Sequence, residues 1–154
     1  HHTVRKYLDI LSGTFMIRLL TPWFENISKR QVKSPKIYLR DSGLLHALVG
    51  IQDAEQLQVH PKLGSSWEGF ALEEIIKQYH ALTEECYFWA TQAGAELDLL
   101  IMKDGKRIGF EFKYTDAPKI TPSMRIAIET LKLDHLYIVF PYKEDSFPLA
   151  EKIT

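Results

Sequence analysis

From Gly94 to Lys113 the chain reads GAELDLLIMKDGKRIGFEFK. Its two apolar runs flank the polar segment 102–106, whose Asp-Gly-Lys is typical of a tight turn, and the pattern predicts two strands joined as a hairpin. Because the side chains of a strand alternate between its faces, Glu111 and Lys113 should share one face. The two phenylalanines of the second strand should share the other face.

The same alternation gathers the acidic residues of the first strand. Glu96 and Asp98 should share one face of that strand. The opposite face should carry Leu97, Leu99 and Ile101. If these aliphatics and the phenylalanines point into one core, three carboxylates and one ammonium gather on the other side. Burying carboxylates so close together is costly unless a cation or a base compensates, so the hairpin is a candidate site for a divalent metal ion.

The composition is that of an ordinary globular protein. The chain has 154 residues, 45% hydrophobic and 25% charged, enough for one compact domain or two small ones sharing a core. Cys86 is the single cysteine, which excludes an internal disulfide and a cysteine-based zinc site and indicates a reducing, cytoplasmic setting. No apolar run approaches the ~20 residues of a membrane span, and no signal peptide is visible. Because the chain starts at His1 without methionine, we expect it to be a fragment.

The charge is distributed unevenly. Residues 1–40 hold eight of the 19 Lys and Arg residues but only two of the 20 Asp and Glu residues. This basic head carries a net charge of +6 and the rest of the chain −7, which favours contact between the head and nucleic acid. The candidate contact residues are Arg5, Lys6, Lys29, Arg30, Lys33 and Lys36. The alternative is a solvated face or an intramolecular interface.

The head is expected to form a partial winged helix over residues 1–50. The pattern predicts a helix over 3–11, a strand over 15–20, a basic turn over 25–35 and a returning strand over 36–39, followed by a short helix from Asp41 to Gly50. A polar connection over 51–63 then marks the domain boundary.

Residues 51–154 are expected to form a second, α/β domain. A helix from Ser66 to about Leu82 precedes a strand over 86–90 and the hairpin, and a helix over 124–131 precedes a strand over 135–140. This α-β-β-β-α-β order predicts a mixed sheet flanked by helices, with the last strand parallel to an earlier one.

The first helix of this domain contributes further acidic residues. At about 100° per residue, its apolar face should consist of Trp67, Phe70, Ala71, Ile75 and Tyr79. Glu74 lies within this stripe and Glu68 at its edge, whereas Glu73 should point away. An acidic residue on a core-facing stripe is unusual unless it is paired or serves a site, so Glu68 or Glu74 is expected to face the same metal as Asp98 and Glu111.

This arrangement resembles the PD-(D/E)XK nuclease superfamily. Asp98 takes the place of the first motif acid, preceded by Leu97 rather than proline, and Glu111-Phe112-Lys113 takes the place of the second half of the motif. The order of elements agrees: an acidic helix, a strand, the Gly-x-Glu-x-Asp strand, a turn, the Glu-x-Lys strand, a helix and a strand. The resemblance implies a restriction-endonuclease-like mixed sheet flanked by helices.

The whole chain is also similar to the carboxy-terminal portion of bacterial and archaeal P-loop AAA-type ATPases of unknown function. The matching segments are TVRKYLDIL (3–11), KSPKIYLRDSGLL (33–45), GSSWEGF (64–70), GAELD (94–98) and EFK (111–113). In that family an ATPase module precedes a winged helix and a nuclease-like domain. The resemblance therefore implies two partners, DNA and the ATPase module of the same parent chain. The chain has no Gly-x-x-x-x-Gly-Lys-Ser/Thr loop, so we expect no ATPase activity from it.

The nuclease resemblance also implies roles for the acidic residues. Mg²⁺ or Mn²⁺ would be bound by Asp98 and Glu111, with the carbonyl of Phe112 as a third ligand, and Lys113 would orient the attacking water or stabilise the developing charge. The other candidate ligands are Glu68, Glu74 and Glu96.

Two functions of different classes remain open. One is a metal-dependent nuclease that acts on DNA together with the ATPase. The other is a catalytically inactive nuclease-fold module that binds DNA or protein and regulates the ATPase. They differ in whether Asp98, Glu111 and Lys113 converge on one metal-sized pocket. Taken alone, Glu111 and Lys113 could equally be a solvent-facing ion pair on a strand.

Overall fold

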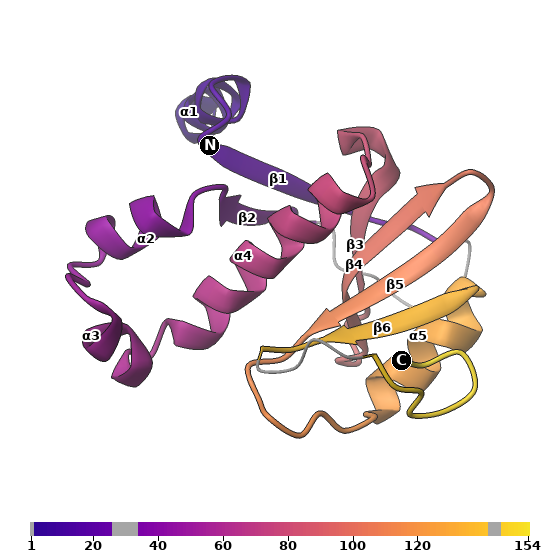
Figure 1. Ribbon diagram of the computed structural model, residues 1–154. Helices are drawn as coiled ribbons and strands as arrows, with labels where there is room; N and C mark the ends of the chain where they lie inside the picture. Colours follow the sequence, from indigo (N-terminus) through magenta and orange to yellow (C-terminus); the bar gives the residue numbers. More distant parts are fainter. Residues whose placement is uncertain (1, 26–33, 142–145) are drawn as a thin grey trace.

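The computed structural model describes residues 2–25, 34–141 and 146–154 (Figure 1). The strands are β1 (Ile17–Pro22), β2 (Lys36–Leu39), β3 (Cys86–Ala90), β4 (Glu96–Lys103), β5 (Lys106–Phe112) and β6 (His135–Val139). The helices are α1 (His2–Gly13), α2 (Ser42–Leu48), α3 (Ala54–Val59), α4 (Leu63–Gln78) and α5 (Pro122–Leu131), with a 3₁₀ turn, η1, at Thr83–Glu85.

The strands form one six-stranded mixed sheet in the order β2-β1-β3-β4-β5-β6. β1 pairs parallel with β3 and β5 pairs parallel with β6, while the other neighbours are antiparallel. The mixed α/β class and the parallel closing strand are therefore confirmed. Within the described ranges, no helix is long and apolar enough to cross a membrane.

Helices cover both faces of the sheet, and each face has its own apolar cluster. α4 packs on one face through residues such as Leu72 and Ile76, together with Phe110 and Phe112 of β5. α5 packs on the other face, where its core residues are Met124, Ala127 and Leu131. The hairpin of β4 and β5 lies between these layers (Figure 1). Its residues 97–101 and 109–112 are buried.

The hairpin turn is a two-residue Asp104-Gly105 connection, and both residues have positive φ. This is the geometry that twisted antiparallel strands favour, which explains why the Asp-Gly pair predicts the turn. Gly109 of β5 is required for a different reason. A Cβ there would lie 2.7 Å from Leu133 Cδ1, because the strand passes close to the chain that follows α5.

The predicted faces of β4 need a correction. Leu97 lies in the α5 cluster, whereas Leu99 and Ile101 lie in the α4 cluster. The cause is a β-bulge, since Tyr87 pairs with Leu100 but Trp89 pairs with Leu97, so Asp98 and Leu99 together oppose Phe88. A strict period of two cannot foresee the extra residue.

The faces of α4 also differ from the prediction. Glu74 is exposed, where it pairs with Lys77, and Phe70 is about half exposed. Glu73, predicted to point away, is buried at 2% exposure. Both Arg18 of β1 and Arg40 bind its carboxylate, with Arg18 Nε 2.5 Å from Oε1. The apolar stripe of the helix therefore does not decide which side is buried, because two arginines compensate one buried acid.

The head is part of the sheet that continues into the rest of the chain. β2 matches its predicted range of 36–39, and the predicted helices over 3–11, 41–50 and 124–131 are present with slightly different ends. α3, capped by Asp53, lies within the predicted polar connection and was missed. Most of the predicted basic turn falls outside the described residues.

Candidate functional site

Six charged residues among the predicted site residues meet where β4 and β5 separate. The pairing of these strands runs from the hairpin turn to Leu99 and Phe110. Beyond that pair, Asp98 Oδ2 accepts a hydrogen bond of 3.0 Å from the backbone N–H of Phe112. The bulge turns Asp98 toward this gap, so a local irregularity of β4 positions the central acid of the site.

Glu111 lies beside Asp98 at this end of β5 and is 4% exposed. Its Oε2 atom is 2.9 Å from Lys113 Nζ, so the Glu-x-Lys pair is an ion pair on one side of the strand. Burial and the charge of Asp98 raise the pKa of Glu111 to about 7, although Lys113 acts in the opposite direction. A carboxyl pKa raised by burial and by a specific charged neighbour is typical of a candidate functional site.

Lys113 remains a cation here. Burial on its own lowers the pKa of Lys113, but the hydrogen bond and charge of Glu111, with further contributions from Asp98 and Glu68, outweigh burial and raise it. Its side chain is 41% exposed, so the ammonium is accessible from solvent while it contacts Glu111.

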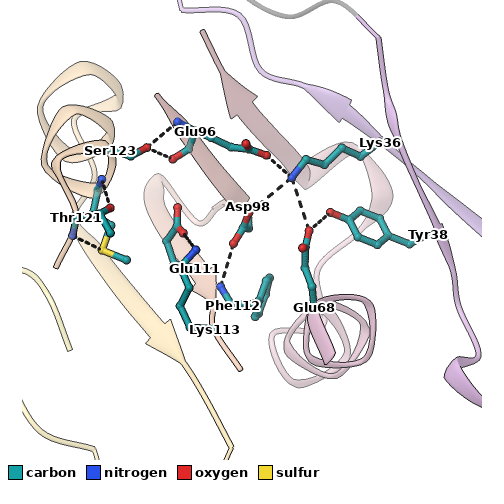
Figure 2. Close-up of polar contacts among 11 residues, drawn as sticks. Lys36, Tyr38, Glu68, Glu96, Asp98, Glu111, Phe112, Lys113, Thr121 and Ser123 are labelled. Carbon is teal, nitrogen blue, oxygen red and sulfur yellow. Dashed lines mark hydrogen bonds and ion pairs between the residues drawn. The ribbon is translucent and has the colours of Figure 1, made fainter. Parts of the chain in front are cut away.

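Glu68 of α4 and Glu96 of β4 lie on the other side of Asp98, and Lys36 of β2 reaches the same place (Figure 2). Lys36 Nζ is 3.6 Å from both Glu68 Oε1 and Asp98 Oδ1 and forms a closer ion pair with Glu96. Glu96 is held in place by α5, because Ser123 Oγ accepts from its N–H and donates to its C=O, both at 2.7 Å. We call Lys36, Glu68, Glu96, Asp98, Glu111 and Lys113 the acidic cluster.

Lys36 is the cluster residue whose surroundings the sequence least foretold. The sequence predicts it as a nucleic-acid contact of the basic head, with an intramolecular interface among the alternatives. In the structure its ammonium points into the acidic cluster. Tyr38 was also missed, and its hydroxyl donates a hydrogen bond of 2.6 Å to Glu68 Oε1. The sequence does contain a signal for this pair, because residues two apart on a strand share a face and Lys36 and Tyr38 should therefore point to the same side of β2.

The structure places three of the remaining candidates, Glu74, Arg5 and Lys6, outside the acidic cluster. Glu74 lies on the exposed side of α4 with Lys77. Arg5 and Lys6 are exposed on α1. The predicted contacts Lys29, Arg30 and Lys33 lie outside the described residues.

Within residues 2–25, 34–141 and 146–154, no three His, Cys, Asp or Glu side chains gather closely enough to hold a metal ion. The physical reason is visible in Figure 2, where Lys36 stands between Glu68, Glu96 and Asp98. The cation beside the Asp98–Glu111 pair is the half-exposed Lys113, which contacts Glu111.

Two family models match this chain, one in its first third and one in the remainder. Residues 63–153, which carry five of the six cluster residues, match the family model described as Domain of unknown function (DUF4143). The chain belongs to this family. Residues 1–55 match a second model, Domain of unknown function (DUF8612). The gap between the two matches, residues 56–62, lies within the connection where the sequence predicts a domain boundary, although the same sheet contains strands from both sides of it.

Two curated relatives are similar to this chain over nearly its whole length. They are the uncharacterized proteins Rv2008c of Mycobacterium tuberculosis and Mb2031c of Mycobacterium bovis, each 50% identical over 151 residues. The alignment covers 98% of this chain but 34% of each relative, so the chain spans about a third of their length. No solved structure matches the chain.

Proposed function

We propose that this chain is a metal-dependent nuclease domain that cleaves DNA phosphodiester bonds as the carboxy-terminal part of an AAA-type ATPase. The observation that supports it most is the meeting of Asp98, Glu111 and Lys113 at the separating ends of β4 and β5. Two acids and a lysine at such a position are what the resemblance to PD-(D/E)XK nucleases implies. The mixed sheet with helices on both faces is compatible with a restriction-endonuclease-like fold.

The donor set fits a magnesium ion. Mg²⁺ prefers hard oxygen ligands, keeps several waters and is commonly held by one or two carboxylates together with substrate phosphates. Asp98 and Glu111 supply two such carboxylates, and burial together with the charge of Asp98 raises the pKa of Glu111 to about 7. The carbonyl of Phe112 would be a third ligand. A bound ion would supply an activated water and a polarised phosphate oxygen.

The residues of the chain would then have distinct tasks. Asp98 is fixed by the hydrogen bond from Phe112 to Oδ2 and by the ion pair of Oδ1 with Lys36, so its carboxylate is preorganised. Lys113, half in solvent and paired with Glu111, would stabilise the charge that develops on the phosphate. A cytoplasmic setting, in which Cys86 stays reduced, is part of the same proposal.

The test is cleavage of single-stranded, duplex and branched DNA with Mg²⁺ or Mn²⁺, and with a chelator as control. Asp98→Asn and Glu111→Gln should each reduce cleavage by about 100-fold or more, since each removes a ligand carboxylate. Glu74→Gln is the matched control, because Glu74 is an exposed acid on α4 outside the acidic cluster. Cleavage that survives in Asp98→Asn, or its absence with all three DNAs in the wild type, would contradict the proposal.

A second candidate function is an inactive nuclease-fold module that binds DNA or protein and regulates the ATPase. It is favoured by one observation, the compensation of Glu68, Glu96 and Asp98 by Lys36. In that case DNA or ATPase binding should persist unchanged in Asp98→Asn, and the wild type should bind no metal.

A further inference from the structure

Lys36 holds an unusual position for a lysine. It comes from β2, at the edge of the sheet, and its ammonium lies among acids of two other elements, Glu68 of α4 and Glu96 and Asp98 of β4. The fourth side of the ammonium faces the ring of Phe88 on β3, whose centroid is 5.5 Å away. The cation is therefore enclosed by groups that each favour positive charge.

The elements around Lys36 are themselves fixed. Tyr38, on the same face of β2, donates its hydroxyl to Glu68 and holds that carboxylate toward Lys36. On the other side, Ser123 at the start of α5 anchors the backbone of Glu96. Figure 2 shows the three carboxylates arriving from different directions at one nitrogen. The ion pairs of Lys36 are therefore held from both sides, and they extend from the buried Asp98 to the half-exposed Glu96.

Asp98 divides the acidic cluster into two halves. Its Oδ1 atom lies 3.6 Å from Lys36 Nζ, and its charge also acts on Glu111. One half, Glu68–Glu96–Asp98, already contains a cation. The other half, Asp98–Glu111, has the half-exposed Lys113, whose Nζ is 2.9 Å from Glu111 Oε2. Nucleases with two metal ions usually have a carboxylate between two cations about 3.5–4 Å apart.

We infer that Lys36 is the built-in second cation of the acidic cluster. Its ammonium occupies the place of one divalent ion among Glu68, Glu96 and Asp98, and it leaves the Asp98–Glu111 half to bind a single ion. The inference rests on the proposed function, because it assumes that Asp98 and Glu111 bind metal. It adds what the nuclease proposal leaves open, the number of metal ions and the reason for that number.

The test is the stoichiometry of Mn²⁺ binding to the 154-residue chain, measured by calorimetry and by the electron paramagnetic resonance signal of free Mn²⁺. The wild type should bind one ion per chain. Lys36→Met removes the ammonium but keeps a side chain of similar length, so it should bind two. Lys36→Arg, which keeps the charge, should bind one. Lys77→Met is the matched control, because it removes a lysine from an exposed ion pair with Glu74, and it should bind one.

Each outcome has a defined meaning. If the wild type and Lys36→Met both bind one ion per chain, at any affinity, the inference is overturned and the nuclease proposal stays intact. The same conclusion follows if the wild type binds two ions. No ion in either protein contradicts the nuclease proposal and the inference together. If Lys36→Met does not fold without metal, Mn²⁺ added during refolding must restore the circular dichroism spectrum of the wild type. Failure to restore it also overturns the inference.

Discussion

At the scale of the residue, the buried charged side chains make the clearest predictions for the stability of this chain. Glu111 is nearly inaccessible, and its raised pKa means that the folded protein binds its proton more tightly than the unfolded chain does. For a carboxyl whose pKa is raised by folding, the free energy of unfolding falls as pH rises through the folded value. The metal-free protein should therefore lose stability between about pH 4.5 and pH 7 because of this group.

The variant Glu111→Gln removes that cost. We predict that it raises the free energy of unfolding by about 1–3 kcal/mol at pH 8, with a gain that disappears below about pH 4.5. Urea unfolding with a chelator present, repeated across the pH range, measures the difference. Equal or lower stability than the wild type at pH 8 would mean that Glu111 has a structural role that its charge does not explain.

Glu73 should behave in the opposite way. Its carboxylate is bound by Arg18 at 2.5 and 3.0 Å and by Arg40 at 3.1 Å, and both Glu73 and Arg18 are buried. Glu73→Gln leaves a buried arginine without its counter-charge, so we predict a loss of about 3 kcal/mol in the free energy of unfolding.

The neighbouring Glu74→Gln is the control for Glu73→Gln. Glu74 is an exposed partner of Lys77, and its loss should change stability by no more than about 0.5 kcal/mol. The comparison by chemical denaturation separates a buried from an exposed acid one position apart on the same helix. Similar losses in the two variants would show that the burial of Glu73 has been misjudged.

At the scale of the element, local sequence patterns predict where strands and helices lie better than they predict which side faces the core. The strands over 86–90 and 36–39 match their predicted ranges. The Asp104-Gly105 pair forms the predicted hairpin turn, because both residues tolerate the positive φ that this turn needs. The face of Leu97 was wrong because the β4 bulge adds a residue, and that bulge depends on pairing with β3. Neither strand alone contains that information.

The acidic cluster shows the same limit. The sequence predicts that Glu111 and Lys113 share a face and that Asp98 lies near them, because these relations are local to one hairpin. It does not predict the position of Lys36, which is sixty residues before Glu96 in the chain and reaches it through the order of strands in the sheet. The sequence predicts Glu74 rather than Glu73 on the buried side of α4, because helical periodicity depends on neighbouring apolar residues. It contains no information about Arg18 and Arg40, which are distant in the chain and bind Glu73.

Two glycines provide a matched test of packing between elements. Gly109→Ala should lower the free energy of unfolding by about 1–3 kcal/mol, since the new Cβ meets Leu133 at 2.7 Å and Leu97 at 3.2 Å in a closed core. Gly64→Ala in α4 meets nothing within 4 Å and should raise it by about 0.5–1 kcal/mol. Thermal unfolding of both variants checks the opposite signs, and a neutral Gly109→Ala would contradict the close approach of β5 to Leu133.

At the scale of the whole molecule, the sheet links the two segments that the family models separate. β1 pairs with β3 and buries Leu20 at 1% exposure, and it carries the arginine that compensates Glu73. Residues 51–154 alone would expose the outer edge of β3 and leave Glu73 without either arginine. A sheet edge and a buried charge left unsatisfied together are strongly destabilising.

We therefore predict that the 51–154 piece does not fold as an independent unit. Circular dichroism and amide proton dispersion should indicate a largely unfolded chain, whereas the 154-residue chain should unfold in a single cooperative transition. A 51–154 piece with native-like dispersion and cooperative unfolding would show that the connection over 51–63 is a true domain boundary.

The central claim is that Asp98 and Glu111 form a site for a divalent cation, and titration of Mn²⁺ into the wild type and Asp98→Asn tests it most directly. We predict saturable binding in the wild type and its loss in Asp98→Asn. The control variant Asp104→Asn, in the exposed hairpin turn where asparagine tolerates positive φ, should bind as the wild type does. Equal binding by the wild type and Asp98→Asn, or no binding by the wild type, would contradict the claim.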